Sequence, residues 1–213
     1  MAHAYMPIGL SLKKRSCLVV GGGKVALRKV NALLDYDTEV TIVAVEPHEK
    51  IEYFAAKGLV KLEKRAYQSP EAQSYGIVIS ASNDGAVNET VHADCKKAGV
   101  PINVVDNPGL CDFIFPAVVR RGCISVSVSS DGKAPFLSGH LKLILENLFS
   151  EARWEKIAGL AADFRARVHK RWPDDHEKRS AAIAKFLESD WKELLRSSTN
   201  QELSKLLDEM LDA

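Results

Sequence analysis

Three consecutive glycines follow a short apolar run, and this feature constrains the fold more than any other. Residues 16–20 (Ser-Cys-Leu-Val-Val) have the length and apolar character of a buried strand, and 24–34 places apolar residues at helical spacing. Gly21, Gly22 and Gly23 lie between them and open the pattern G-x-G-x-x-A. Residues without a Cβ at such a turn let backbone N–H groups and the helix dipole approach a pyrophosphate. The turn therefore predicts nucleotide binding.

The rest of the first half alternates apolar runs with amphipathic segments. Further strands are predicted at 40–45, 59–62, 77–80 and 102–105, and further helices at 51–57 and 87–98. Strands that alternate with helices are typical of a parallel sheet with right-handed crossovers. The fold class is therefore α/β, with a Rossmann-like parallel sheet.

The pattern changes after residue 108. An apolar run at 113–119 precedes 123–129, where Ile124, Val126 and Val128 alternate with serines as in a half-exposed antiparallel strand. Helices are predicted at 135–149, 154–168 and 180–195, with a break at 172–175. We therefore expect a nucleotide-binding domain at 1–112, a small α+β segment at 113–149 and a helical domain at 150–213.

Composition excludes several classes of function. The 213 residues include 29 Lys+Arg and 28 Asp+Glu, and a net charge of +1 favours neither nucleic acid nor an acidic membrane as a partner. No apolar run approaches the roughly 18–20 residues that span a bilayer, and residues 1–8 lack the pattern of a secretory signal. The four cysteines have no zinc-site spacing. We expect a soluble, cytoplasmic protein without a resident metal.

Two acidic residues follow predicted strands. Glu46 lies 20 residues beyond Ala26, where an acidic group can bind an adenosine ribose and favour NAD over NADP; alternatively it only begins the loop before Pro47. Asp106 follows the strand at 102–105, at the edge of the sheet where the glycine turn also lies. Its spacing is equally consistent with a role in proton transfer or substrate orientation and with an Asx turn. Cys111, soon after, is either a packed thiol or a contact to a soft metal.

Five groups of residues, in their order and spacing, resemble a known family. They are Gly21-Gly22-Gly23-Lys24-Val25-Ala26 with Lys29; Ser80-Ala81-Ser82-Asn83-Asp84 with Val87-Asn88; Asn103-Val104-Val105-Asp106; Cys111-Asp112-Phe113-Ile114-Phe115-Pro116 with Arg120-Arg121-Gly122; and Ser127-Val128-Ser129-Ser130 with Gly132 and Ala134-Pro135. Together they resemble the precorrin-2 dehydrogenase/sirohydrochlorin ferrochelatase family, the N-terminal module of siroheme synthases. The resemblance covers about residues 7–149 and, more loosely, the helical tail.

The resemblance implies oxidation of precorrin-2 to sirohydrochlorin with NAD⁺ as hydride acceptor. In many members Fe²⁺ is then inserted as a further substrate to give siroheme. It also implies a homodimer in which 113–149 makes the contacts between subunits, and a tetrapyrrole as the small-molecule partner. Asp106 matches the family's key acid, a general base, and Ser130 matches a serine near the tetrapyrrole.

The resemblance also supplies the binding residues. Cofactor contacts match Lys24, Val25, Val45 and Glu46, and we expect the three glycines of the turn and Ser82-Asn83 to bind NAD with them. We expect Arg120, Lys133 and His140, beside Ser130, to bind the acidic substrate, although His140 is alternatively a surface residue. Asp106, the cofactor-binding residues and the substrate-binding residues together make up the predicted site.

The chain departs from the family pattern in the substrate loop. Asp131, Ala134 and Gly139 stand where the family commonly has Gly, Ser or Thr, and Arg, and Ser82-Asn83 replace Thr-Asp. These departures put in question the detailed substrate contacts and one of the two activities. The alternatives are therefore a dehydrogenase without chelatase activity and, in another class, a non-catalytic NAD(H)-sensing module.

Overall fold

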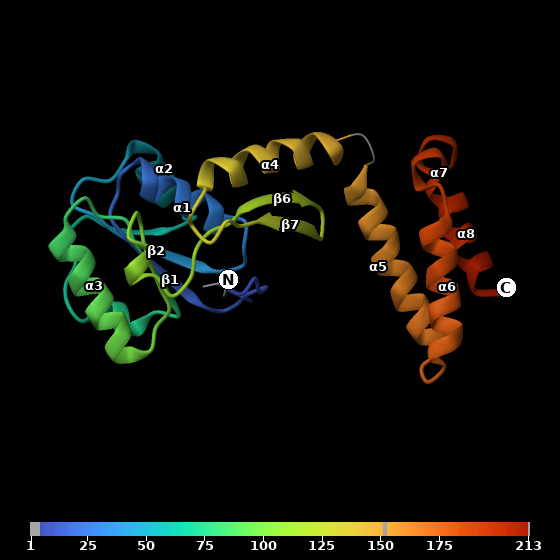
Figure 1. Ribbon diagram of the computed structural model, residues 1–213, viewed down its shortest axis with the longest axis horizontal. Helices are drawn as coiled ribbons and strands as arrows, with labels where there is room; N and C mark the ends of the chain where they lie inside the picture. The colour runs from blue at the N-terminus through green and yellow to red at the C-terminus, as the bar shows by residue number, and fades with distance from the viewer. Residues whose placement is uncertain (1–4, 151–152, 213) are drawn as a thin grey trace. The chain divides into compact units, whose positions relative to one another are not determined.

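The computed structural model describes residues 5–150 and 153–212 of the chain. Its residues group into two compact units, one up to residue 115 and one from residue 116. We describe each unit by itself (Figure 1). The predicted division into 1–112, 113–149 and 150–213 was made by the function expected of each part, and it stays a prediction.

The first unit is built on a five-stranded parallel sheet in the order β3-β2-β1-β4-β5. Its strands are β1 (Ser16–Val20), β2 (Glu39–Val43), β3 (Lys61–Glu63), β4 (Ile77–Ser80) and β5 (Ile102–Val104). Its helices are α1 (Lys24–Leu34), α2 (Glu49–Ala56) and α3 (Gly85–Ala98), with short 3₁₀ turns η1 (Glu71–Ser74) and η2 (Pro108–Leu110). The predicted α/β, Rossmann-like fold is confirmed.

Helices cover both faces of this sheet, which explains the apolar strands. On one face Val19 and Ile42 pack against α1 and α2; on the other Leu18 and Val78 pack against α3 (Figure 1). A strand covered on both faces has no solvent side to alternate with, so it becomes almost wholly apolar. The parallel register places Val20 beside Val43 and Ser80, so that the three central strands end at one edge.

The second unit begins with a hairpin and a helix. Strands β6 (Ala117–Arg121) and β7 (Ile124–Val128) pair antiparallel, with Val119 opposite Val126, and α4 (Pro135–Leu148) follows. The serines of β7 are exposed and its apolar residues half-buried, so the predicted alternation is confirmed. The apolar run predicted from residue 113 becomes a strand only at 117.

Four helices complete the second unit around an aromatic core. They are α5 (Trp154–Arg171), α6 (His176–Glu188), α7 (Trp191–Ser197) and α8 (Asn200–Asp212). Phe186 packs between Phe164 and Trp191, with ring centroids 5.3 and 4.3 Å away. No helix within the described ranges has the length and apolarity needed to cross a membrane.

The single helix predicted at 180–195 is wrong. The chain leaves the helical conformation at Ser189, and the Asp190 carboxylate accepts hydrogen bonds from the backbone N–H groups of Lys192 and Glu193, at 3.1 and 3.2 Å. An aspartate in this position caps a new helix. The apolar periodicity continues across the break between the two helices, so it did not predict the break. The sequence analysis also missed α8.

Candidate active site

The glycine turn is held between two loops at the carboxyl edge of the sheet. Gly21 has φ +109°, and a Cβ there would lie 2.4 Å from the Ala81 carbonyl oxygen, in the loop after β4. A Cβ on Gly22 would lie 2.7 Å from Pro47 Cα, in the loop after β2. Both positions therefore require glycine for close backbone packing. These contacts bring three loops of the predicted cofactor site together.

Gly23 is different, because no atom lies within 4 Å of its Cβ position. It is the N-cap of α1, and no side chain caps the helix there. Within the described residues the backbone N–H groups of 24–26 make no hydrogen bond, and Lys24 is exposed beside them. Open N–H groups and a helix dipole suit an anionic group such as a pyrophosphate.

The loop after β2 places Val45 and Glu46 beside the turn. Strand β2 ends at Val43, two residues earlier than predicted, so both side chains lie in the loop and are exposed. The carbonyl oxygen of Gly22 accepts a hydrogen bond from the N–H of His48 at 2.8 Å. This bond fastens the Glu46 loop to the glycine turn, so an acidic side chain is available where a ribose would lie.

The loop after β4 carries Ser82 and Asn83 and is held by Asn88, which the sequence analysis named as part of the family resemblance without giving it a role. The buried Ser80 hydroxyl donates to Asn88 Oδ1 at 2.6 Å, and Asn88 Nδ2 donates to the Ser82 carbonyl oxygen at 3.0 Å. Asn88 thus positions the loop that contacts Gly21. The available signal was a polar residue next to Val87 on the inner side of a predicted amphipathic helix.

Asp106 begins the turn after β5 in the left-handed conformation, with φ +60°, and it is exposed. The turn is closed by the N–H of Asn107, which donates to the Val104 carbonyl oxygen at 3.2 Å. Within the described part of the chain the Asp106 carboxylate accepts no hydrogen bond, so the Asx-turn alternative is wrong. Aspartate adopts the left-handed conformation more readily than most residues other than glycine.

Cys111 packs beneath this turn and closes the edge of β5. Its Sγ accepts from the N–H of Val104 at 3.2 Å and donates to the Val104 carbonyl oxygen at 3.1 Å. Burial raises the pKa of the thiol. A protonated thiol engaged with the backbone is a poor metal ligand, so the packing alternative is favoured. No cluster of three or more His, Cys, Asp or Glu side chains that could hold a metal occurs within 5–150 and 153–212.

Lys29 is a second residue whose role the sequence analysis missed. Its ammonium nitrogen lies 3.9 Å from the centroid of the Phe115 ring. Burial, and then the charge of Arg28, lower the pKa of Lys29 to about 8, while the charges of Cys111 and Asp106 act in the opposite direction. Its sequence signals were its place in the family resemblance and its position on a face of α1 that is otherwise apolar.

The predicted substrate residues lie in the second unit. Ser130 is in the loop between β7 and α4, and its Oγ accepts a hydrogen bond from the N–H of Ala134 at 3.1 Å. Asp131 and Gly132 follow with φ +52° and +75°, so the loop turns sharply. Lys133 is exposed in this loop, and His140 is exposed on α4. Arg120 lies on β6 opposite Ser125.

Two other basic residues near this loop already have partners. The Arg121 guanidinium donates to the carbonyl oxygens of Glu146 and Phe149, at 3.3 and 3.4 Å, and thereby satisfies the end of α4. Lys142 lies 3.6 Å from the Glu146 carboxylate. Arg121 is therefore a structural residue of this unit.

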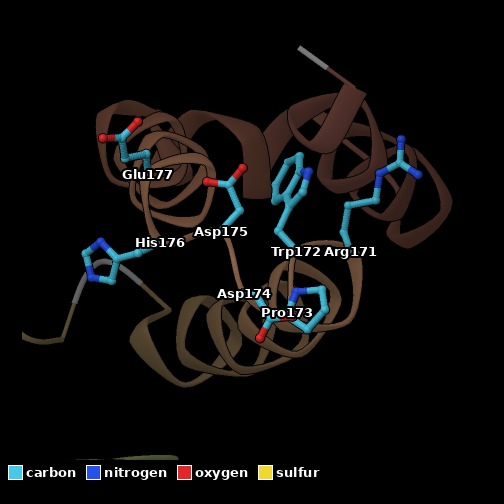
Figure 2. A pocket seen from close by; sticks show the side chains of 7 residues that line it. All are labelled: Arg171, Trp172, Pro173, Asp174, Asp175, His176 and Glu177. Carbon is cyan, nitrogen blue, oxygen red and sulfur yellow. The ribbon is translucent and has the colours of Figure 1, made fainter.

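A shallow hollow of about 500 Å³ in the second unit lies at the junction of α5 and α6 and is lined by residues 171–177. Figure 2 shows Trp172 and Asp175 pointing between the helices, while Arg171 and His176 point outward on opposite sides. Asp175 caps α6 by accepting from the N–H of Lys178 at 3.0 Å. None of the predicted site residues lines this hollow, which we interpret as the surface of a helix–helix turn.

Comparisons with known proteins show the family and the fold of the chain. A family described as "Putative NAD(P)-binding" matches residues 8–117. The siroheme synthases of Methylococcus capsulatus (strain ATCC 33009 / NCIMB 11132 / Bath) and Nitrosomonas europaea are 36% and 34% identical over 209 residues, which are 98% of this chain and 44% of each relative. The chain thus spans less than half the length of these relatives. A solved structure named SirC, precorrin-2 dehydrogenase, has a TM-score of 0.76 at 21% identity and covers 98% of this chain and 100% of its own, which shows a shared fold.

Proposed function

The chain belongs to the NAD(P)-binding family whose model it matches and is a homologue of siroheme synthases, and from this premise we propose that it oxidises precorrin-2 to sirohydrochlorin with NAD⁺. One observation carries the proposal: the glycine turn and the loops after β2 and β4 meet at one edge of the sheet, and Asp106, left-handed and exposed, lies in the turn that follows β5 at the same edge. A cofactor site and an acidic group are thus both built at the carboxyl ends of the strands, where ligands of such sheets bind.

The residues present fit a dinucleotide. The first turn of α1 offers N–H groups without side-chain caps, Gly23 is open, and Glu46 stands beside the turn. When bound, NAD⁺ accepts the hydride. The acidic Glu46 favours a free ribose hydroxyl over a phosphate, so NAD is the proposed cofactor rather than NADP.

Asp106 is proposed as the general base. Oxidation of precorrin-2 removes two hydrogens: a hydride goes to the nicotinamide and a proton goes to a base. An exposed carboxylate that accepts no hydrogen bond from its own turn is available to take that proton. Ser130, Arg120, Lys133 and His140 are proposed to bind the acidic tetrapyrrole.

We also propose that the protein is a homodimer and that α4 forms part of the contact between its subunits. Along α4 the apolar side chains at 137, 141, 144 and 148 share one face and are 39–69% exposed, as is Leu143 at 58%. A contiguous apolar stripe on a helix surface marks an interaction site rather than a solvated face. We assign a second copy of the chain to it, because the resemblance places subunit contacts within 113–149.

We extend the proposal to insertion of Fe²⁺ into sirohydrochlorin, with Fe²⁺ as a substrate. Insertion of Fe²⁺ releases two N–H protons from the macrocycle, and Asp106 is proposed to accept each in turn and pass it to solvent. Incubation of purified protein with sirohydrochlorin and Fe²⁺ or Co²⁺ should give the metallated product. If no metal is inserted while precorrin-2 is oxidised, the dehydrogenase-only alternative holds.

The deciding experiment gives purified protein precorrin-2 and NAD⁺ and follows NADH and sirohydrochlorin absorbance. We expect both products from the wild type and a loss of about 10²–10⁴-fold in turnover for Asp106→Asn, with NAD⁺ binding retained. Asp37→Asn, an exposed carboxylate at the opposite end of the strands, is the matched control and should keep full activity. Tight NAD⁺ binding without turnover by the wild type would favour the NAD(H)-sensing alternative.

A further inference from the structure

Lys29 carries a positive charge that no acidic side chain neutralises by contact. Its side chain is only partly exposed on α1, and its ammonium nitrogen lies 3.9 Å from the centroid of the Phe115 ring. Among the residues that the structure describes, no Asp or Glu oxygen lies within 4.0 Å of this nitrogen, whereas Lys64 and Lys96 each pair with a carboxylate. A ring face fixes the position of a cation without neutralising it, so the charge stays available to an anion from outside the chain.

The ring that holds the ammonium belongs to a segment fastened to β5 and to the turn after it. The Cys111 sulfur lies 3.3 Å from the carbonyl oxygen of Asn107 in that turn. Asn103 on β5 donates from Nδ2 to the Phe113 carbonyl oxygen at 2.9 Å, and the rings of Phe113 and Phe115 lie 5.6 Å apart. The ammonium is thus held, through this ring, on the segment that follows the turn of the proposed general base.

Two ligands of the proposed reaction are anionic: the cofactor, through its pyrophosphate, and the tetrapyrrole, through its carboxylates. The pyrophosphate is proposed to lie at the backbone N–H groups of 24–26, in the first turn of α1. Lys29 lies further along this helix and contacts the segment after β5, rather than the loops after β2 and β4 that meet the glycine turn. Its charge therefore matches a carboxylate of the substrate better than the pyrophosphate of the cofactor.

The surroundings of the ammonium favour such a pair. Burial is the main cause that lowers the pKa of Lys29 to about 8, because the ammonium has already lost part of its hydration. An ion pair at a partly desolvated cation is screened less by water than a pair at an exposed lysine. A carboxylate bound at Lys29 therefore gains more than it would at the surface.

We propose, on the premise of the dehydrogenase function above, that Lys29 binds a carboxylate of the tetrapyrrole with the ammonium that is held on the Phe115 ring. The other basic residues proposed to bind the substrate lie in the second unit. Lys29 lies in the first unit, with the cofactor turn and Asp106, and so anchors the substrate to the unit that receives its hydride and its proton. No bond to Lys29 forms or breaks in the reaction.

Equilibrium binding of sirohydrochlorin, the product, tests the proposal without turnover. In a titration followed by the absorbance of the tetrapyrrole, Lys29→Met should raise Kd at least about tenfold, because it removes one charge-assisted pair. Lys29→Arg keeps the charge and should stay within about threefold of the wild type. Kd for NAD⁺ should stay within about twofold of the wild type in both variants.

Lys57→Met is the matched control, because it also removes one positive charge from a position over an aromatic ring. Lys57 lies 5.6 Å from the centroid of Tyr53 and is exposed at the end of α2. This variant should bind sirohydrochlorin as the wild type does.

A double-mutant cycle separates a binding role of Lys29 from a structural one. Phe115→Leu removes the ring but keeps the charge, so it should raise Kd for sirohydrochlorin about threefold. In the Lys29→Met background the same substitution should have no further effect on Kd. A loss of affinity caused only by weaker packing would be equal in the two backgrounds and would contradict the proposal.

The other outcomes also decide. Unchanged sirohydrochlorin affinity in Lys29→Met overturns the proposal, as does a wild type that binds no sirohydrochlorin, or a loss of affinity for NAD⁺ in place of sirohydrochlorin. Should Lys29→Met fail to fold, Lys29→Gln, which keeps a polar end without the charge, takes its place. A wild type that binds sirohydrochlorin through Lys29 yet forms no NADH from precorrin-2 would count against the dehydrogenase function alone.

Discussion

At the carboxyl edge of the sheet, single side chains set the positions of the loops that form the site. Asn88 is the clearest case, because one amide joins the buried Ser80 hydroxyl to the Ser82 carbonyl oxygen. Nothing in the periodicity of α3 distinguishes this residue from other polar positions. Its importance comes from what lies opposite it in space, on a loop that contacts the glycine turn.

Asn88→Ala should destabilise the first unit by about 1–3 kcal/mol, because it leaves the buried Ser80 hydroxyl without a partner. The free energy of unfolding in urea measures this loss. Asn88→Asp keeps the acceptor for Ser80 but places a carboxylate oxygen against the Ser82 carbonyl oxygen, so it should displace the Ser82 loop and weaken NAD⁺ binding. Equal stability of Asn88→Ala and the wild type would contradict the assigned role.

The position of Glu46 predicts that the protein prefers NAD⁺ to NADP⁺. Glu46→Gln removes the charged acceptor proposed for the ribose and should raise Kd for NAD⁺ about tenfold, with little change for NADP⁺. Isothermal titration with both cofactors measures the two constants. Glu49→Gln, another exposed acid, three residues on at the start of α2, should leave both unchanged. If Glu46→Gln binds NAD⁺ as tightly as the wild type, Glu46 does not contact the ribose and only begins the loop before Pro47.

At the scale of elements, the site depends on how the β1–α1 turn packs against its neighbours. Gly21 and Gly22 are required by backbone packing, whereas Gly23 faces open space at the N-terminus of α1. Three adjacent glycines therefore serve two purposes. The first two pack against loops of the protein, and the third leaves open space at the start of α1, where we propose that the cofactor binds.

This difference predicts opposite results for two neighbouring substitutions. Gly22→Ala places a Cβ within 2.7–2.9 Å of the loop after β2, so it should destabilise the fold by about 1–3 kcal/mol and weaken NAD⁺ binding as a consequence. Gly23→Ala should change stability by less than about 0.5 kcal/mol yet still weaken NAD⁺ binding. Thermal unfolding and NAD⁺ titration of both variants check the pattern. Full NAD⁺ affinity in Gly23→Ala would show that the pyrophosphate does not approach this glycine.

At the scale of the whole molecule, the apolar stripe of α4 (residues 137, 141, 144 and 148) predicts that two copies of the chain form a dimer. Ile144 is 50% exposed at the centre of the stripe, and a charge buried there in a dimer would lack a partner. Ile144→Asp should therefore convert a dimer into monomers, as measured by sedimentation velocity. Leu187→Asp, at a 75% exposed position on α6, should sediment like the wild type. A wild type that is monomeric at micromolar concentration would end the dimer proposal.

Most of the fold was predictable because its signals are local. The apolar strands, the helical spacing of α1 and the glycine turn each depend on residues a few positions apart, so the α/β class and strands β1 and β4 followed directly from the pattern. The errors lay where a local signal is ambiguous. At 180–195 the apolar periodicity continued through Asp190, although its capping hydrogen bonds end one helix and begin another.

The amino-acid sequence by itself determined the sheet, the nucleotide turn and the edge at which Asp106 would stand, because parallel strands carry their ligands at their carboxyl ends. Only the tertiary structure decided which residues meet there. In the tertiary structure Asn88 bonds Ser80 and Ser82, and Cys111 bonds the backbone of Val104 in β5. The Lys29 ammonium lies over the Phe115 ring. These partners are separated by up to 86 positions, and their contacts depend on packing in three dimensions, which no local pattern encodes.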